Sequence, residues 1–129
     1  MPFELTTRDG ILFARVFGVF TAADLTHLAT EAEIAEASHP FALDRITDLT
    51  AVERFEMGFQ EIYFFAIRRS AQRFSRVVKS AIVVREPVQF GMARMYEALN
   101  ENPQIRLRIV RGVPDANEWF AEIHDAPNG

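Results

Sequence analysis

The sequence predicts an α/β domain in which a mixed, mostly parallel sheet of about five strands begins with an N-terminal β-hairpin and is covered by four helices. Two observations support this fold class. β-Branched apolar runs alternate along the chain with segments whose apolar residues repeat at helical spacing, in the order ββαβαβαβα. The first two runs are joined by Asp9-Gly10, which is a strong hairpin signal.

The first third of the chain predicts the hairpin and one helix. Residues 3–6 and 11–17 are apolar and β-prone, and they lie on either side of the turn. A helix then opens at Thr21, whose side chain can form a variant of the capping box with Asp24. This helix is expected to end at residues 39–40, because the residue before a proline disfavours helical geometry.

The middle of the chain alternates between strand and helix. Residues 45–50 are expected to form a short buried strand, and residues 57–74 a helix. The β-branched run 77–84 is too short for a core helix, so we place it centrally in the sheet. A third helix opens at Pro87, which suits a first helical turn, and it is followed by an alternating strand over residues 105–109.

The last predicted element is a helix that opens at Pro114 and Asp115. Its apolar side carries Ala116, Trp119, Phe120 and Ile123. We expect Trp119 to pack against the sheet and anchor this helix.

Composition limits the function classes. The 129 residues fit one domain, which we expect over residues 1–124, with a flexible polar tail over residues 125–129. The absence of cysteine excludes disulfides, zinc–thiolate sites and a cysteine nucleophile. No apolar run has the length of a membrane span, and the N-terminus does not resemble a signal peptide, so we expect a cytoplasmic protein. A net charge of −4 argues against nucleic acid as the partner.

Basic residues cluster around the end of the second predicted helix: Arg68, Arg69, Arg73, Arg76 and Lys79. One interpretation is a solvated helix end, where cations are favoured by the helix dipole. The other is a site for an anionic partner. The sequence leaves both open.

Three segments resemble the STAS-like family, the fold of bacterial anti-sigma-factor antagonists. Residues 46–52 (ITDLTAV) resemble the family's strand that ends in Asp-Leu-Ser/Thr-x-Val. Residues 91–99 resemble the third helix of a bacterial STAS-like subgroup, and residues 110–120 resemble that subgroup's final strand, turn and helix. The resemblance spans nearly the whole chain, and it implies the family's fold and a regulatory, protein-binding role.

One departure from the family pattern affects the implied function. Regulatory STAS domains carry a phosphorylated Ser or Thr at the start of the second helix, where the added charge breaks the partner interface. The matching residues 55–59 (FEMGF) contain no hydroxyl group. Thr50 carries the nearest hydroxyl group, and we interpret it as a local turn or cap residue. The family's phospho-switch is therefore not expected at this position.

Catalytic and cofactor motifs are absent from the sequence. It contains no Gly-x-Ser-x-Gly, no phosphate-binding glycine loop and no Gly-x-Gly-x-x-Gly, so we expect no enzyme, no cofactor and no metal. The histidines His27, His39 and His124 are scattered and are expected at the surface or at helix ends. Asp48 and Thr50 form a weak candidate site at a strand end, where open α/β sheets bind ligands.

The second predicted helix is unusually apolar, since a helix on a sheet should be polar on its outer side. If Phe59, Ile62, Tyr63 and Ala66 face the sheet, then Phe64 and Phe65 cannot both do so. The aromatics could form a wide core face, a protein interface or an apolar ligand pocket. Our candidate interaction surface consists of Phe59, Tyr63, Phe64 and Phe65, with Arg68 and Arg69 at its rim.

These observations favour a non-catalytic, regulatory STAS-like module that binds another protein or a second copy of itself. The alternative is a carrier for a small apolar, lipid-like molecule. It rests on the same aromatics and on the likeness between STAS folds and the CRAL-TRIO lipid-transfer fold.

Overall fold

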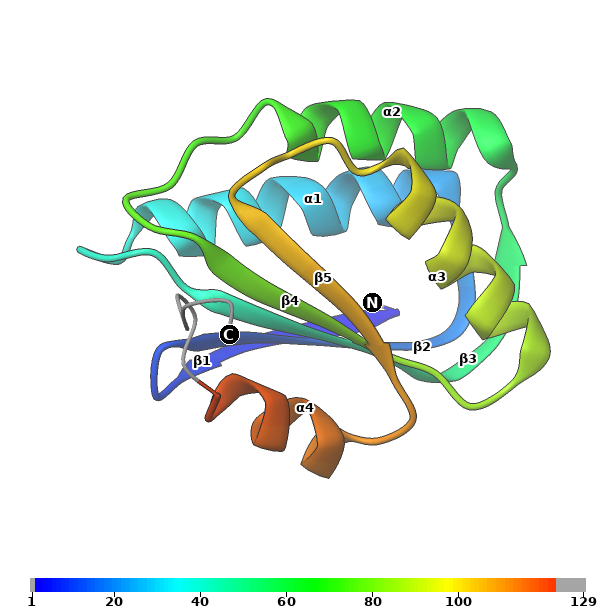
Figure 1. Ribbon diagram of the computed structural model, residues 1–129. Coiled ribbons are helices and arrows are strands. Elements are labelled where there is room, and N and C mark those ends of the chain that lie inside the picture. The colour runs from blue at the N-terminus through cyan, green and yellow to red at the C-terminus, as the bar shows by residue number, and fades with distance from the viewer. Residues whose placement is uncertain (1, 123–129) are drawn as a thin grey trace.

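The computed structural model describes residues 2–122, and its elements follow the order ββαβαβαβα (Figure 1). The strands are β1 (Phe3–Arg8), β2 (Ile11–Thr21), β3 (Asp44–Glu56), β4 (Val78–Val83) and β5 (Ile105–Val110). The helices are α1 (Ala22–Ala37), α2 (Phe59–Ser70), α3 (Pro87–Leu99) and α4 (Val113–Phe120). The fold class and element order predicted from the sequence are confirmed.

The five strands form one sheet in the order β1-β2-β3-β4-β5. β1 and β2 are antiparallel, and every later pair is parallel. The run that we placed centrally is β4, which is fully buried between β3 and β5. The middle position belongs to β3 instead, because each strand is added beside the one that precedes it in the chain.

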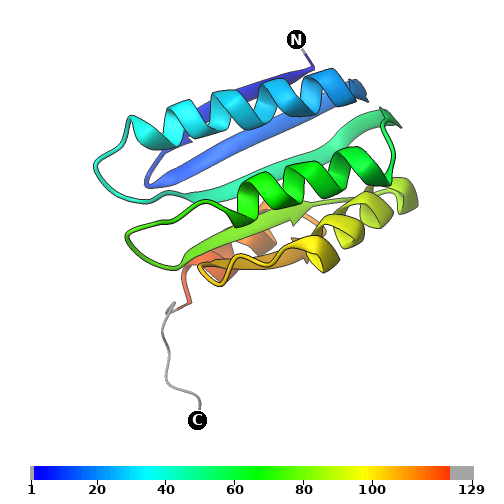
Figure 2. The same ribbon diagram turned by 90° about the horizontal axis from the view of Figure 1, so that it is seen from above.

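The helices cover both faces of the sheet unequally. α1, α2 and α3 lie side by side on one face, with α2 between the other two, while α4 lies on the opposite face (Figure 2). α2 packs mainly against its neighbours α1 and α3. Within residues 2–122 no helix is long and apolar enough to cross a membrane.

Two local predictions from the sequence are confirmed. Asp9 and Gly10 have φ angles of 54° and 80°, the positive pair that a two-residue hairpin turn requires. Thr21 caps α1 as expected: its Oγ1 accepts from the Asp24 backbone at 3.2 Å, and its own backbone N–H donates to the Asp24 carboxylate at 3.0 Å.

β3 and α2 differ most in length from the prediction, and β2 also continues to Thr21 rather than ending at Phe17. β3 extends to Glu56 rather than ending at Thr50. Its pairing with β4 ends at Asp48, but its pairing with β2 continues as far as Thr21 and Glu56. α2 ends at Ser70 rather than at Phe74. The backbone N–H and C=O of Phe74 are instead both bonded to the side-chain amide of Gln104, each at 2.8 Å.

The core is divided by the sheet. The larger part lies beneath the three helices. The smaller part lies on the α4 side, where Trp119 is buried with Ile46, Ala81, Val83 and Val110, as expected for its anchoring role. The expected contribution of Ile123 to the last helix and the expected tail 125–129 lie outside the described residues.

Candidate functional site

Four large apolar side chains on the outer side of α2 are exposed to solvent: Phe59 (57%), Tyr63 (42%), Phe64 (57%) and Ile67 (48%). Phe59, Tyr63 and Ile67 recur every four residues and so form a line along the helix. The ring of Tyr63 lies 6.0 Å from the rings of both Phe59 and Phe64, measured between centroids. We call these four residues the α2 apolar face.

The residues on the inner side of α2 differ in part from those expected. Ile62 and Ala66 are buried as predicted, but Phe59 and Tyr63 are not. Tyr63 directly follows Ile62 and is therefore turned about 100° away from it. Phe65 is partly buried, and its ring centroid lies 5.3 Å from that of Tyr96 on α3. Of the two phenylalanines that could not both face the sheet, Phe64 is thus the exposed one.

The two arginines predicted at the rim have different environments. Arg68 is partly exposed and makes two hydrogen bonds to Glu33 of α1, at 2.7 and 2.8 Å. Arg69 is only 3% exposed, so its predicted rim position is wrong. It lies two turns after Ile62 and therefore shares that residue's inward direction.

The basic residues at and after the end of α2 do not gather into one site. Arg76 pairs with Asp44 at 3.1 Å. Lys79 is buried on the opposite face of the sheet, where its Nζ donates to the carbonyls of Trp119 and Glu122. Arg73 is exposed and donates to the carbonyls of Ser70, the last residue of α2, and of Gln72, which agrees with the solvated-helix-end interpretation for this one residue. The cluster in the sequence is therefore separated in space.

Asp48 and Thr50 lie inside β3 and not at its end. The Asp48 carboxylate accepts hydrogen bonds from the Thr50 backbone N–H at 2.9 Å and from its hydroxyl at 2.7 Å. The register of β2 and β3 shifts at this point, between Arg15 and Phe17. The pair thus closes a local turn within a β-bulge, the cap role that we expected for Thr50.

Two of the histidines have local partners. His27 lies 3.4 Å from Glu31 on the surface of α1, and His39 Nδ1 lies 3.0 Å from the carbonyl oxygen of Ala35. His124 lies outside the described residues. Over residues 2–122 the structure contains no group of three or more acidic or histidine side chains that could hold a metal ion.

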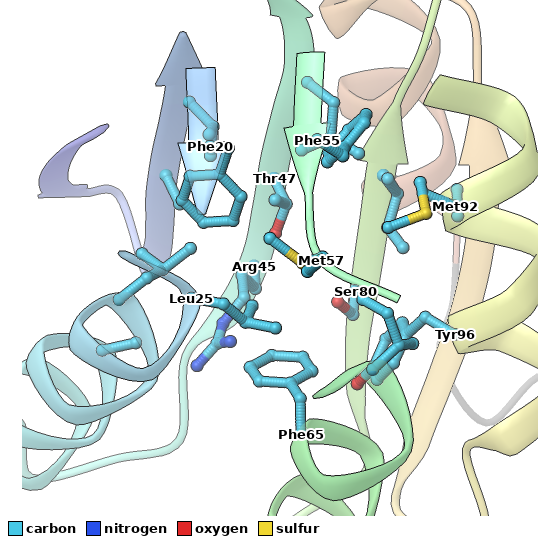
Figure 3. A pocket seen from close by; sticks show the side chains of 18 residues that line it. Phe20, Leu25, Arg45, Thr47, Phe55, Met57, Phe65, Ser80, Met92 and Tyr96 are labelled. Carbon is cyan, nitrogen blue, oxygen red and sulfur yellow. The ribbon is translucent and has the colours of Figure 1, made fainter. Parts of the chain in front are cut away.

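The structure also contains a cavity, and an apolar pocket was one of the alternatives that the sequence left open for the α2 aromatics; of these, Phe65 lines it, whereas Phe59, Tyr63 and Phe64 do not. Its volume is about 80 Å³, and it lies between the sheet and the three helices α1, α2 and α3 (Figure 3). Most of its lining is apolar, and Ile62 and Phe65 of α2 contribute to it. The polar lining residues are Arg45, Thr47, Ser80 and Tyr96. We call this space the central cavity.

A buried charge cluster borders the central cavity. Arg45 Nη2 lies 2.9 Å from a carboxylate oxygen of Glu36, and Arg69 Nη1 lies 3.4 Å from the same oxygen. Arg69 also donates to the Gln72 side chain at 2.7 Å. Within the described part of the chain, Arg45 Nε and Arg69 Nη2 have no hydrogen-bond partner. Two buried guanidinium groups therefore share one carboxylate.

Burial changes the titration of this cluster. Loss of water, followed by the repulsion from Arg45, lowers the pKa of the Arg69 guanidinium to about 10. Burial also raises the pKa of Tyr96, which lies beside Arg69. One sequence signal could have revealed the cluster: Arg45 opens a segment that otherwise reads as a buried strand.

Comparison with solved structures supports the family resemblance at the level of the fold. An uncharacterized protein of the DUF3478 family from Shewanella loihica PV-4, described as having a SpoIIAA-like fold, superposes with a TM-score of 0.61. The alignment covers 91% of this chain and 90% of that protein, at 14% sequence identity. No family model and no curated protein matches the chain. The protein therefore has a STAS-like fold.

Proposed function

Starting from the STAS-like fold, we propose that this protein is a non-catalytic, regulatory interaction module of the bacterial cytoplasm. Its docking surface is the α2 apolar face. The observation that carries this proposal is the exposure of Phe59, Tyr63, Phe64 and Ile67 on one helix. Contiguous exposed aromatic side chains are typical of protein interfaces, since leaving each of them in water forgoes about 1.5–3 kcal/mol of burial.

A second copy of this chain is the partner that the surface fits best. The line formed by Phe59, Tyr63 and Ile67 is centred on Tyr63. In an antiparallel pair of α2 helices with a two-fold axis at Tyr63, Phe59 of one copy lies opposite Ile67 of the other.

Sedimentation velocity tests this pairing. We expect the wild-type protein to be a dimer and the variant Tyr63→Ser/Phe64→Ser to be a folded monomer. Phe41→Ser is the matched control, because Phe41 is equally exposed (59%) but lies in the loop before β3, outside the α2 apolar face. This control should remain dimeric. A monomeric wild type at about 100 μM, or a double variant that stays dimeric, would exclude the symmetric pair.

The central cavity favours a second function, that of a carrier for a small ligand. The cavity is lined mainly by apolar side chains, as small-molecule sites usually are. Its volume of about 80 Å³ suits a very small molecule and not a long lipid. Binding of 1-propanol, followed by amide chemical shifts in NMR spectra, tests this function. No shift among residues that line the cavity would contradict it.

A further inference from the structure

We propose that the central cavity binds a short-chain aliphatic carboxylate, with the head group against Arg45 and the alkyl chain beneath α2. The inference rests on the carrier function and is independent of the α2 apolar face. Figure 3 shows the arrangement: Arg45 and Ser80 enter from adjacent strands, and Leu25, Phe65 and Met92 enter from the three helices around them.

The charges beside the cavity are unbalanced. Arg45 and Arg69, both buried, share the single carboxylate of Glu36, whose side chain is 11% exposed. The neighbouring pair Arg68 and Glu33 is balanced within itself and therefore supplies no further negative charge. A buried guanidinium without a full counter-charge is costly. A ligand carboxylate would complete two ion pairs from the two arginines.

Three polar side chains stand beside one another on the sheet wall of the cavity. Arg45 is 7% exposed, lines the cavity, and its Nε has no partner within the described residues. Ser80 is the residue directly paired with Arg45 between β3 and β4, so both side chains stand on the same face of the sheet. Thr47 lies two residues further along β3 and shares that face. Together they offer donors to both oxygens of a carboxylate.

The space beside these polar side chains is small and mostly apolar. Arg45 is the one charged residue among the lining side chains, and the others around the tail region are apolar. A volume of about 80 Å³ is smaller than the roughly 150 Å³ of a cavity that holds benzene. The ligand must therefore be smaller than benzene, and propionate is the longest aliphatic carboxylate that we expect to fit, with the flexible side chains of Met57 and Met92 adjusting around it.

Titrations of the wild-type protein with propionate, 1-propanol and propylamine, followed by ¹H–¹⁵N NMR, test the proposal. These three probes share one short tail and differ in the charge of the head group. We expect propionate to bind at least about tenfold more tightly than 1-propanol, because a charged hydrogen-bond partner is added, and propylamine to bind more weakly than either. The Arg45 Nε–H resonance should shift with propionate.

The decisive variant is Arg45→Met, which keeps a long apolar side chain and removes the guanidinium. It leaves Glu36 paired one-to-one with Arg69, so we expect it to fold. It should bind propionate no better than 1-propanol. Arg106→Met is the matched control, since it removes the same charge from the opposite face of the sheet, where Arg106 pairs with Lys79 in the register of β4 and β5. The control should bind propionate as the wild type does.

If 1-propanol binds and propionate binds no more tightly, the carboxylate proposal is wrong while the carrier function stands. If neither binds, both are wrong. Propionate affinity that survives Arg45→Met would place the head group elsewhere and overturn the proposal. Should this variant fail to fold, an unshifted Arg45 Nε–H resonance in the propionate-bound wild type would overturn it equally.

Discussion

The side-chain nitrogen of Lys79 donates a hydrogen bond of 2.7 Å to the backbone carbonyl of Trp119 and so joins β4 to the end of α4. The same nitrogen donates to the carbonyl of Glu122 at 3.0 Å and lies 5.2 Å from the centre of the Trp119 ring. A cation at a helix C-terminus is favoured both by the helix dipole and by the free carbonyls of the last turn. Lys79 therefore acts as a cap supplied by the sheet.

We predict that Lys79→Met destabilises the protein by about 1–3 kcal/mol, because the two carbonyls lose their donor inside the structure. The free energy of unfolding in urea measures this loss. Arg106→Met serves as the control, since Arg106 is the register partner of Lys79 on β5 but is exposed; its effect should stay within about 0.5 kcal/mol. A Lys79→Met variant as stable as the wild type would mean that the cap contributes nothing.

Trp119→Ala should cost about 3–5 kcal/mol, the usual range for a buried large aromatic side chain. Trp119 is buried against β3, β4 and β5, and its loss would open a cavity beneath α4. Because Trp119 is the chain's one tryptophan, unfolding of the variant must be followed by circular dichroism and not by fluorescence. A loss below about 1 kcal/mol would show that α4 is peripheral to the fold.

Local chemistry explains why the fold could be predicted. Asp9-Gly10, Thr21 with Asp24, and Pro87 each specify a turn or helix start through their own backbone and side chains. The misjudged boundaries depend on distant partners. α2 stops short of Phe74 because Gln104, thirty residues away in the chain, bonds to both of its backbone groups. No local pattern near Phe74 carries that information.

The candidate site was predictable only in part, for a similar reason. Helical spacing correctly implied that one of Phe64 and Phe65 must be exposed. It could not fix the rotation of α2 about its axis, and that rotation buries Arg69 and exposes Tyr63. The central cavity depends on where three helices stop above the sheet, which is a property of packing. The pairing of Arg45 with Ser80 likewise depends on strand register between segments far apart in sequence.

Glu36→Gln should destabilise the protein strongly, by about 3–5 kcal/mol, because it leaves Arg45 and Arg69 buried without a counter-charge. Glu33→Gln is the matched control: it removes the same charge one turn earlier on α1, from a partly exposed pair with Arg68, and should cost less than about 1 kcal/mol. Urea unfolding compares the two variants. Equal losses would contradict the view that the Glu36 cluster is distinct from a surface ion pair.

The adjacent residues Phe64 and Phe65 test the orientation of α2 about its axis. Phe65 packs on Tyr96 and against the main core, so Phe65→Ala should cost about 2–4 kcal/mol, less than a fully buried phenylalanine because part of its ring is in water. Phe64 is exposed, so Phe64→Ala should change the stability of the monomer by less than about 0.5 kcal/mol.

Both variants must be unfolded in urea at protein concentrations low enough to dissociate any dimer, since a dimer held by Phe64 would add its own stability at higher concentration. Raising the concentration should then stabilise the wild type and Phe65→Ala but not Phe64→Ala. If Phe64→Ala proved the more damaging change in the dilute monomer, α2 would have to be rotated by about 100° from the orientation described above. The α2 apolar face would then consist of different residues.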